Sequence, residues 1–129
     1  IDNFLAVTED LISNNNEVVF LLGPAEKERF SNATIKTINS LSRCFTDLSL
    51  SKVLELLSCT DIFIGNDSGI THLAAGLGTR TLSVFGPTNP DICKPIGPDV
   101  TVFTAGKTTF AKKSSSRMQR KILKVLCEL

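Results

Sequence analysis

The sequence has almost no excess of charge of either sign, and this limits the partners it can have. Its 129 residues include 14 Lys and Arg against 13 Asp and Glu, which gives a formal net charge of +1. Trp and Tyr do not occur, and no stripe of basic residues interleaved with aromatic residues appears. Such a chain presents no overall positive field to a polyanion. We therefore expect no nucleic-acid partner.

Long apolar runs are also missing. No stretch approaches the roughly 20 consecutive apolar residues that cross a bilayer as a helix, and no signal peptide opens the sequence. We expect a cytoplasmic protein that is peripheral to a membrane at most. Basic residues gather near the carboxyl end and are predicted to form a solvated helix face, with contact to an anionic membrane surface as the alternative. They are Lys107, Lys112, Lys113, Arg117, Arg120, Lys121 and Lys124.

Close cysteine pairs are a third absence. Cys44, Cys59, Cys93 and Cys127 are widely scattered, and no Cys/His cluster has the spacing of zinc ligands. In an intracellular α/β chain this spacing is typical of buried free thiols. We therefore expect no metal site.

Apolar and β-branched runs alternate with helical patterns along the chain. Strands that alternate with helices predict right-handed crossovers and a parallel sheet covered on both faces. The fold class is therefore α/β, a Rossmann-like open parallel sheet with helices on both faces, and residues 1–129 are expected to form a single domain. The expected helices are Phe4–Ser13, Ala25–Leu41, Ser51–Ser58, Ile70–Leu77 and Arg117–Leu129, the expected strands are Glu17–Leu22, Cys44–Thr46, Ile62–Ile64, Thr81–Phe85 and Val100–Thr104, and Gly106–Ser116 is expected to be a polar loop.

The segment 61–90 is the most informative part of the chain. It begins with a short buried strand, followed by the polar turn Asn66–Gly69 and then by a helix. In an open parallel sheet, ligands bind in the crevice at the carboxyl ends of the strands. The start of a helix has unpaired N–H groups and a dipole that favours an anion. A phosphate or diphosphate would fit at Ser68 to Thr71.

His72, the only histidine, lies five residues after Asp67 and so near enough to the helix start to face the same ligand. The alternative is structural: Asp67 or Ser68 caps the helix, and His72 is a half-buried polar residue. The turn by itself fits both interpretations.

The surroundings of the turn favour a binding site. The helix contains Ala74, Ala75 and Gly76 and is followed by Gly78, so it is expected to be thin and to lie close against the sheet. The next strand is ended sharply by the turn Gly86–Pro90.

Several motifs follow one another in a fixed order. They are Asp67-Ser68-Gly69, His72-Leu73-Ala74-Ala75, Gly78 and Phe85-Gly86-Pro87-Thr88-Asn89-Pro90. This order resembles the carboxyl-terminal half of glycosyltransferase family nine, the heptosyltransferase-like enzymes. Upstream, the apolar run Val18–Leu22 with Gly23-Pro24-Ala25-Glu26 resembles the family's strand and Gly-Pro-x-Glu turn, and Leu48-Ser49-Leu50 resembles the loop before its next helix. The resemblance weakens after Pro90.

The resemblance implies a set of donor-binding residues. In the family, the Glu after Gly-Pro and the loop before the next helix hold the donor's nucleoside, and these positions correspond to Glu26 and Leu48. The Asp-Ser/Thr-Gly turn and the His hold the diphosphate-sugar end, which the chain matches with Asp67, Ser68, Gly69 and His72.

Glu26, Leu48 and Asp67 each have a structural role to set beside contact with a ligand. An acid in the first turn of a helix is favourable without any ligand, so Glu26 fits a surface role as well as a bond to ribose hydroxyls. Leu48 is expected to pack, with any ligand contact made by its backbone. Asp67 would be repelled by a diphosphate, so its expected role is to fix the turn or to accept hydrogen bonds from sugar hydroxyls.

The family is two-lobed, with the GT-B fold, and this chain resembles its donor lobe without the amino-terminal lobe and without the first strand of the donor lobe. The implied function is transfer of a sugar, heptose from ADP-heptose, to a lipid-linked saccharide acceptor of lipopolysaccharide type, at the inner face of the inner membrane. Metal and cofactor are not required, because the nucleotide-diphosphate sugar is a substrate. The general base is expected on the other lobe, so no catalytic residue is assigned, and this chain alone is expected to be inactive.

Two other functions stay open. A sugar-nucleotide epimerase lobe shares the two-lobed fold and a similar Asp-Ser-Gly turn, although the residues that follow the turn favour the transferase. A non-catalytic nucleotide-binding module is the second alternative.

Overall fold

Five parallel strands form the framework of the described part of the molecule. A computed structural model describes residues 1–104, 120, 122–124 and 126. The strands that it contains form a two-stranded sheet, β1–β2, and a three-stranded sheet, β3–β4–β5, and every pairing is parallel. Their bounds are β1 Val19–Leu22, β2 Arg43–Thr46, β3 Ile62–Asn66, β4 Arg80–Phe85 and β5 Val100–Thr104.

Helices connect consecutive strands, as crossovers between parallel strands require. The α/β class predicted from the sequence is confirmed, with the difference that the described strands form two sheets and not one. The helices are α1 Asp2–Ser13, α2 Pro24–Arg29, α3 Asn32–Leu41, α4 Leu50–Ser58, α5 Gly69–Gly76 and α6 Pro90–Cys93.

Two stretches of secondary structure differ from the sequence prediction. The single helix expected from Ala25 to Leu41 is divided into α2 and α3, because Ser31 caps a new helix by accepting a hydrogen bond from the Thr34 N–H at 3.1 Å. The short helix α6 was not predicted. It begins at Pro90, where Asn89 caps it through the Asp91 N–H at 3.0 Å.

Most of the predicted loop 106–116 and of the predicted helix 117–129 lies outside the described residues. The described residues of the second segment, 120, 122–124 and 126, are helical.

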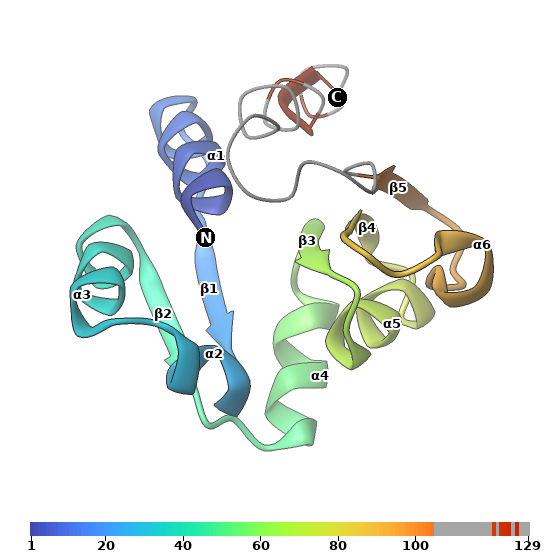
Figure 1. The fold of residues 1–129 in the computed structure, drawn as a ribbon, viewed down its shortest axis with the longest axis horizontal. Coiled ribbons are helices and arrows are strands. Elements are labelled where there is room, and N and C mark those ends of the chain that lie inside the picture. The colour runs from blue at the N-terminus through green and yellow to red at the C-terminus, as the bar shows by residue number, and fades with distance from the viewer. Residues whose placement is uncertain (105–119, 121, 125, 127–129) are drawn as a thin grey trace.

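Apolar clusters lie on both faces of the strand layer. On one face, Val7 of α1 packs with Leu82 of β4, Phe103 of β5 and Ile122. On the other face, Val53 and Leu57 of α4 pack with Ala74 of α5. The second cluster also includes Leu21 of β1 and Phe63 of β3, so it joins the two sheets (Figure 1).

Helix α5 lies close to the sheet through its alanines. Ala74 and Ala75 are fully buried, as the sequence predicted. Gly76 differs from that prediction, since it is exposed and a Cβ placed on it would meet no atom within 4 Å. Close packing does require a glycine at Gly97, in the loop before β5, because a Cβ there would lie 2.2 Å from the carbonyl oxygen of Ala75.

The cysteine prediction is only partly confirmed. Cys44, Cys59 and Cys93 are free thiols, but none of these three is fully buried, and Cys59 is exposed. Partial burial raises the pKa of the Cys44 thiol. Cys127 lies outside the described residues.

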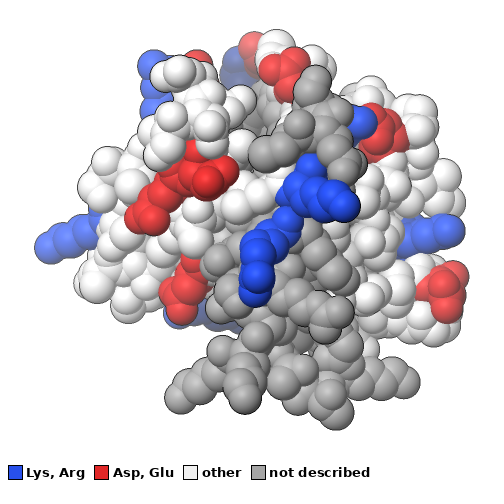
Figure 2. All heavy atoms as spheres, turned by 90° about the horizontal axis from the view of Figure 1, so that it is seen from above, with Lys and Arg blue, Asp and Glu red and all other residues white. Residues whose placement is uncertain are grey.

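Charged side chains of both signs occur on the face of the molecule that is seen from above. Figure 2 shows Lys and Arg as well as Asp and Glu there, with no broad area of one sign among the described residues of this face. Arg120 and Lys124, from the basic carboxyl-terminal segment, are exposed. No helix within the described ranges is long and apolar enough to cross a bilayer.

Strand β4 contains a buried hydroxyl, Oγ of Ser83, that has no hydrogen-bond partner within the described residues. Replacing this residue, Ser83→Ala, is expected to leave the free energy of unfolding unchanged or to raise it by about 1 kcal/mol, because an unpaired buried hydroxyl pays desolvation without a compensating bond. Thr81→Val is the matched control on the same strand. Thr81 is also fully buried, but its Oγ1 donates to the Thr79 carbonyl at 2.8 Å.

The control is expected to lower the free energy of unfolding by about 1 kcal/mol, since it leaves a carbonyl without its donor. Urea unfolding of both variants makes the comparison. Equal destabilisation by the two substitutions would contradict the interpretation that Ser83 is unpaired.

Candidate functional site: the carboxyl ends of the strands

The turn between β3 and α5 is organised by three hydrogen bonds. Ser68 caps α5, because its Oγ accepts from the Thr71 N–H at 3.4 Å and lies 3.0 Å from the Thr71 hydroxyl oxygen. The Thr71 hydroxyl donates to the carbonyl of Asn66 at 2.5 Å, which ties the first turn of the helix to the end of the strand. Thr71 is fully buried. Its role is therefore to hold the turn in place.

This cap determines which backbone groups remain for an anion. Ser68 occupies the Thr71 N–H, and the His72 N–H donates to the Ser68 carbonyl at 3.3 Å. Within the described residues, the N–H groups of Gly69 and Ile70 have no partner. These two donors lie in the first turn, where the helix dipole favours negative charge. The sequence predicted an anion site at residues 68–71. In the structure, the free backbone donors of this turn among the described residues are the N–H groups of Gly69 and Ile70.

Asp67 and His72 lie side by side across the turn. The distance from His72 Nε2 to Asp67 Oδ1 is 3.9 Å, too long for a hydrogen bond but close enough for attraction when the imidazole is protonated. The His72 side chain is 46% exposed and that of Asp67 is 22% exposed. The imidazole can therefore reach a ligand in solvent, while the carboxylate is held closer to the protein.

Glu26 lies in the first turn of α2, directly after β1. Its Oε2 accepts a hydrogen bond from the Gly23 N–H at 3.1 Å. Gly23 is the residue before α2, so the Glu26 carboxylate caps the start of its own helix. This bond agrees with the alternative role predicted for Glu26, that of an acid which stabilises the first turn of a helix without any ligand. Within the described residues no group donates to its second oxygen, so a capping role leaves one oxygen available to a ligand.

Leu48 follows β2, and its side chain packs against the cluster of Val53, Leu57 and Ala74. Any contact of Leu48 with a ligand therefore has to come from its backbone, as the sequence suggested. Next to it, Asp47 accepts a hydrogen bond from Lys27 of α2 at 2.5 Å.

This bond joins helix α2, which carries Glu26, to the loop that carries Leu48. It lowers the pKa of the exposed Asp47 carboxyl, because the ammonium of Lys27 stabilises the charged form. Neither Lys27 nor Asp47 was predicted from the sequence as part of the site. The two residues are separated by 20 positions, and only the pairing of β1 with β2 brings them together.

The six predicted residues fall into two groups. Asp67, Ser68, Gly69 and His72 share one turn at the carboxyl end of β3, whereas Glu26 and Leu48 follow β1 and β2 in the other sheet. Both groups follow the carboxyl ends of parallel strands, which is where ligands bind in open α/β sheets. Among the described residues, no three His, Cys, Asp or Glu side chains gather where they could hold a metal ion.

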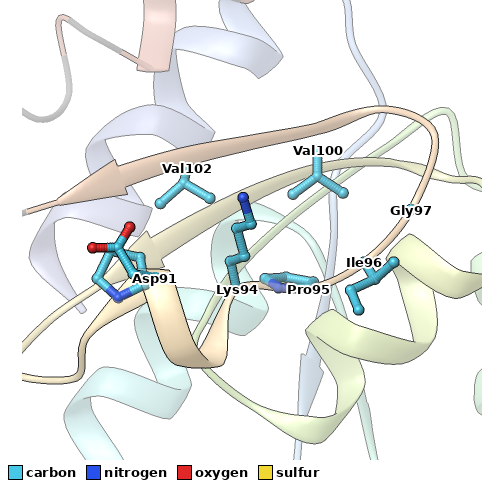
Figure 3. Close-up of a pocket in the computed structure, with 8 residues that line it drawn as sticks. Asp91, Lys94, Pro95, Ile96, Gly97, Val100 and Val102 are labelled. Carbon is cyan, nitrogen blue, oxygen red and sulfur yellow. The ribbon is translucent and has the colours of Figure 1, made fainter.

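A cavity of about 480 Å³ lies elsewhere, beside the edge strand β5. Figure 3 shows Lys94 extending towards Val100 and Val102, with Asp91 to one side. The remaining lining residues are Pro90, Pro95, Ile96 and Gly97. None of the predicted donor-binding residues lines this cavity.

Comparison with protein families identifies the chain. Residues 1–123 match the model of glycosyltransferase family 9 (heptosyltransferase). The chain belongs to this family. The resemblance seen in the motifs between Asp67 and Pro90 is therefore confirmed, and it extends over most of the chain.

Curated relatives carry heptosyltransferase names. Over 99 residues, 73% of this chain, the family 9 chain is 25% identical to lipopolysaccharide heptosyltransferase 2 of Salmonella typhimurium. A stretch of 43 residues is 46% identical to lipopolysaccharide heptosyltransferase 1 of Pseudomonas aeruginosa, which is 33% of this chain and 12% of that protein.

Solved structures show the same fold. A glycosyltransferase family 9 protein of Veillonella parvula matches 99% of this chain with a TM-score of 0.75 at 17% identity. The ADP-heptose lipopolysaccharide heptosyltransferase II of Escherichia coli matches 98% with a TM-score of 0.73 at 18% identity. This family 9 chain spans 41% of each solved chain and 28% of the Salmonella relative.

Proposed function

We propose that residues 1–129 form the donor-binding lobe of a glycosyltransferase that transfers heptose from ADP-heptose to a lipid-linked saccharide of lipopolysaccharide type. The observation that carries the proposal is the turn Asp67–His72 at the start of α5, in a chain whose residues 1–123 match family 9. The names of the relatives from Salmonella and Pseudomonas support the sugar and the acceptor.

In this proposal the first turn of α5 binds the diphosphate. The free N–H groups of Gly69 and Ile70 donate to phosphate oxygens, and His72 donates a further hydrogen bond. As the bond to the sugar breaks, negative charge accumulates on the departing diphosphate. Donors that are already in position stabilise that charge without reorganisation.

The other predicted residues recognise the ends of the donor. Asp67 accepts hydrogen bonds from sugar hydroxyls, and its capped turn keeps the carboxylate in place. The second oxygen of Glu26 accepts from the ribose, with the backbone at Leu48 beside the base. The acceptor site and its general base belong to a second lobe outside these residues. We place the reaction at the inner face of the inner membrane, where a lipid-linked acceptor is accessible.

Calorimetric titration of the full polypeptide with ADP, UDP and GDP tests the site, and the same titration with ADP-heptose tests the sugar contact. His72→Ala is expected to weaken ADP binding about tenfold, the loss of one hydrogen bond to a charged group. Asp67→Ala is expected to leave ADP affinity unchanged and to weaken ADP-heptose binding. Asp91→Ala is the control, an exposed acid in the first turn of α6.

The outcomes separate the candidate functions. Tighter binding of UDP or GDP would reject the adenine donor, and binding that neither site variant changes would reject the site. Turnover of ADP-heptose without any acceptor would indicate an epimerase, whereas binding without turnover in the presence of acceptor would indicate a non-catalytic module.

A further inference from the structure

Helix α2 carries Glu26 but has little apolar packing to hold it in place. None of its six residues is buried, and Glu26 alone is half-buried while the other five are exposed. A helix this short is marginal unless it packs against the rest of the protein. The orientation of α2 therefore depends on its polar contacts.

The two side-chain hydrogen bonds of α2 differ in range. Glu26 accepts from the Gly23 N–H, so this bond stays within the first turn of the helix. Lys27 instead donates to the Asp47 carboxylate across a distance of 2.5 Å, to a residue 20 positions further along the chain. Among the described residues, no other side-chain hydrogen bond or ion pair joins α2 to another element. In Figure 1 the loop from β2 to α4 accordingly passes beside α2.

The loop that carries Asp47 is held firmly on its other side. It connects β2 with α4 through three residues, of which Leu48 packs in the apolar cluster and Ser49 caps α4 by accepting from the Lys52 N–H at 3.5 Å. Asp47 itself has a φ of 56°, a left-handed conformation that Asp adopts more readily than most residues. Its carboxylate therefore gives α2 a fixed point of attachment.

We propose that Lys27 is a positioning residue for the donor, because its bond to Asp47 holds α2 in the orientation in which the second oxygen of Glu26 meets the ribose hydroxyls. This inference rests on the proposed function, which assigns that oxygen to the ribose. A Cβ at Gly23 would lie 3.0 Å from Glu26 Oε2, so the first oxygen already fits closely against the backbone. The direction of the carboxylate thus follows the direction of the helix, and a helix oriented in advance lowers the cost of ordering on binding.

The size of the effect is limited by solvent. The Lys27 side chain is 42% exposed and that of Asp47 is 61% exposed, and exposed ion pairs are weak. Loss of the bond is expected to lower the oriented fraction of α2 about threefold to fivefold, and affinity falls in proportion to that fraction. Only ligands with ribose hydroxyls are affected, because the α5 turn that binds the diphosphate follows a strand of the other sheet.

Calorimetric titration of the full polypeptide with ADP, dideoxy-ADP and pyrophosphate tests the proposal. Dideoxy-ADP lacks both ribose hydroxyls, so the unchanged protein is expected to prefer ADP about tenfold. Lys27→Met is expected to reduce the affinity for ADP about threefold to fivefold, and the affinities for dideoxy-ADP and pyrophosphate by less than about twofold. Lys27→Arg is expected to restore ADP binding, because a guanidinium also binds a carboxylate.

A second background separates positioning from direct contact. If Lys27 acts through Asp47, adding Lys27→Met to Asp47→Ala causes no further loss of ADP affinity. A further loss in that background, or an equal loss of pyrophosphate binding, would overturn the proposal and would indicate that the ammonium contacts a phosphate itself.

Arg80→Met is the matched control. It removes another exposed ion pair between separate segments, Arg80 with Asp99 at 2.8 Å, at the amino ends of β4 and β5. This variant is expected to change none of the three affinities, and an effect equal to that of Lys27→Met would contradict a specific role for Lys27. An unchanged protein that binds dideoxy-ADP as tightly as ADP would reject the ribose contact of the proposed function and this inference with it. A ribose preference that survives Lys27→Met would overturn the positioning role alone.

Discussion

Gly97→Ala is expected to lower the free energy of unfolding by about 3 kcal/mol, the upper end of the usual cost of overpacking. A Cβ at this position would lie 2.2 Å from the carbonyl oxygen and 2.7 Å from the carbonyl carbon of Ala75. Both atoms belong to the backbone of helix α5 at the fully buried Ala75, so no side-chain rotation can relieve the clash. Either the loop before β5 or the helix has to move away from the sheet.

Gly76→Ala is the matched control, one residue along from the clash. A Cβ on Gly76 meets no atom within 4 Å, and the residue is the last of α5. Alanine is the better helix former, so this variant is expected to be neutral or more stable by up to about 1 kcal/mol. Urea unfolding of the two variants gives both values. A Gly97 variant as stable as the Gly76 variant would mean that the loop does not lie against Ala75.

Gly69→Pro is expected to reduce the affinity for ADP by about tenfold or more while the protein stays folded. Proline removes one of the two free N–H donors of the α5 first turn, a loss of about 1.5–3 kcal/mol for a bond to a charged group. The helix itself tolerates the change. Gly69 is the first residue of α5, where proline is favourable, and Ser68 before it is already extended, with φ −156° and ψ 161°.

Gly69→Ala separates the donor from the side chain. A Cβ at Gly69 meets nothing within 4 Å, and alanine keeps the N–H, so ADP affinity is expected to change by less than about threefold. Calorimetric titration gives the affinities, and circular dichroism checks that α5 survives. If the alanine variant lost as much affinity as the proline variant, the cause would be the volume of the added carbon and not the missing donor.

Much of the local structure could be predicted from the chain. The alternation of apolar runs with helical patterns predicted all five strands of the described residues. The helices that Ser49 and Ser68 cap begin at Leu50 and Gly69, one residue before the predicted starts. The exceptions are places where a helix cap lies inside a segment whose pattern predicted another structure. Ser31 starts a new helix in the middle of a helical pattern, and Asn89 with Pro90 starts α6 where a plain turn was expected.

The candidate site was predictable where it consists of consecutive residues. Asp67, Ser68, Gly69 and His72 are neighbours on one turn, so their proximity follows from the chain itself. Tertiary contacts decided the rest. The bond from the Thr71 hydroxyl to the Asn66 carbonyl, which ties the first turn of α5 to the end of β3, depends on how the helix meets the strand.

The sequence by itself determined the fold class and the family. The alternation of strand and helix patterns indicates the fold class, and the order of short motifs indicates the family. Only the tertiary structure decided that Lys27 meets Asp47, that Gly97 lies against Ala75 of α5, and that the described strands pair as two sheets. The physical reason is the range of the interactions. Caps and turns act over a few residues, whereas strand pairing and close packing join segments whose separation along the chain carries no signal.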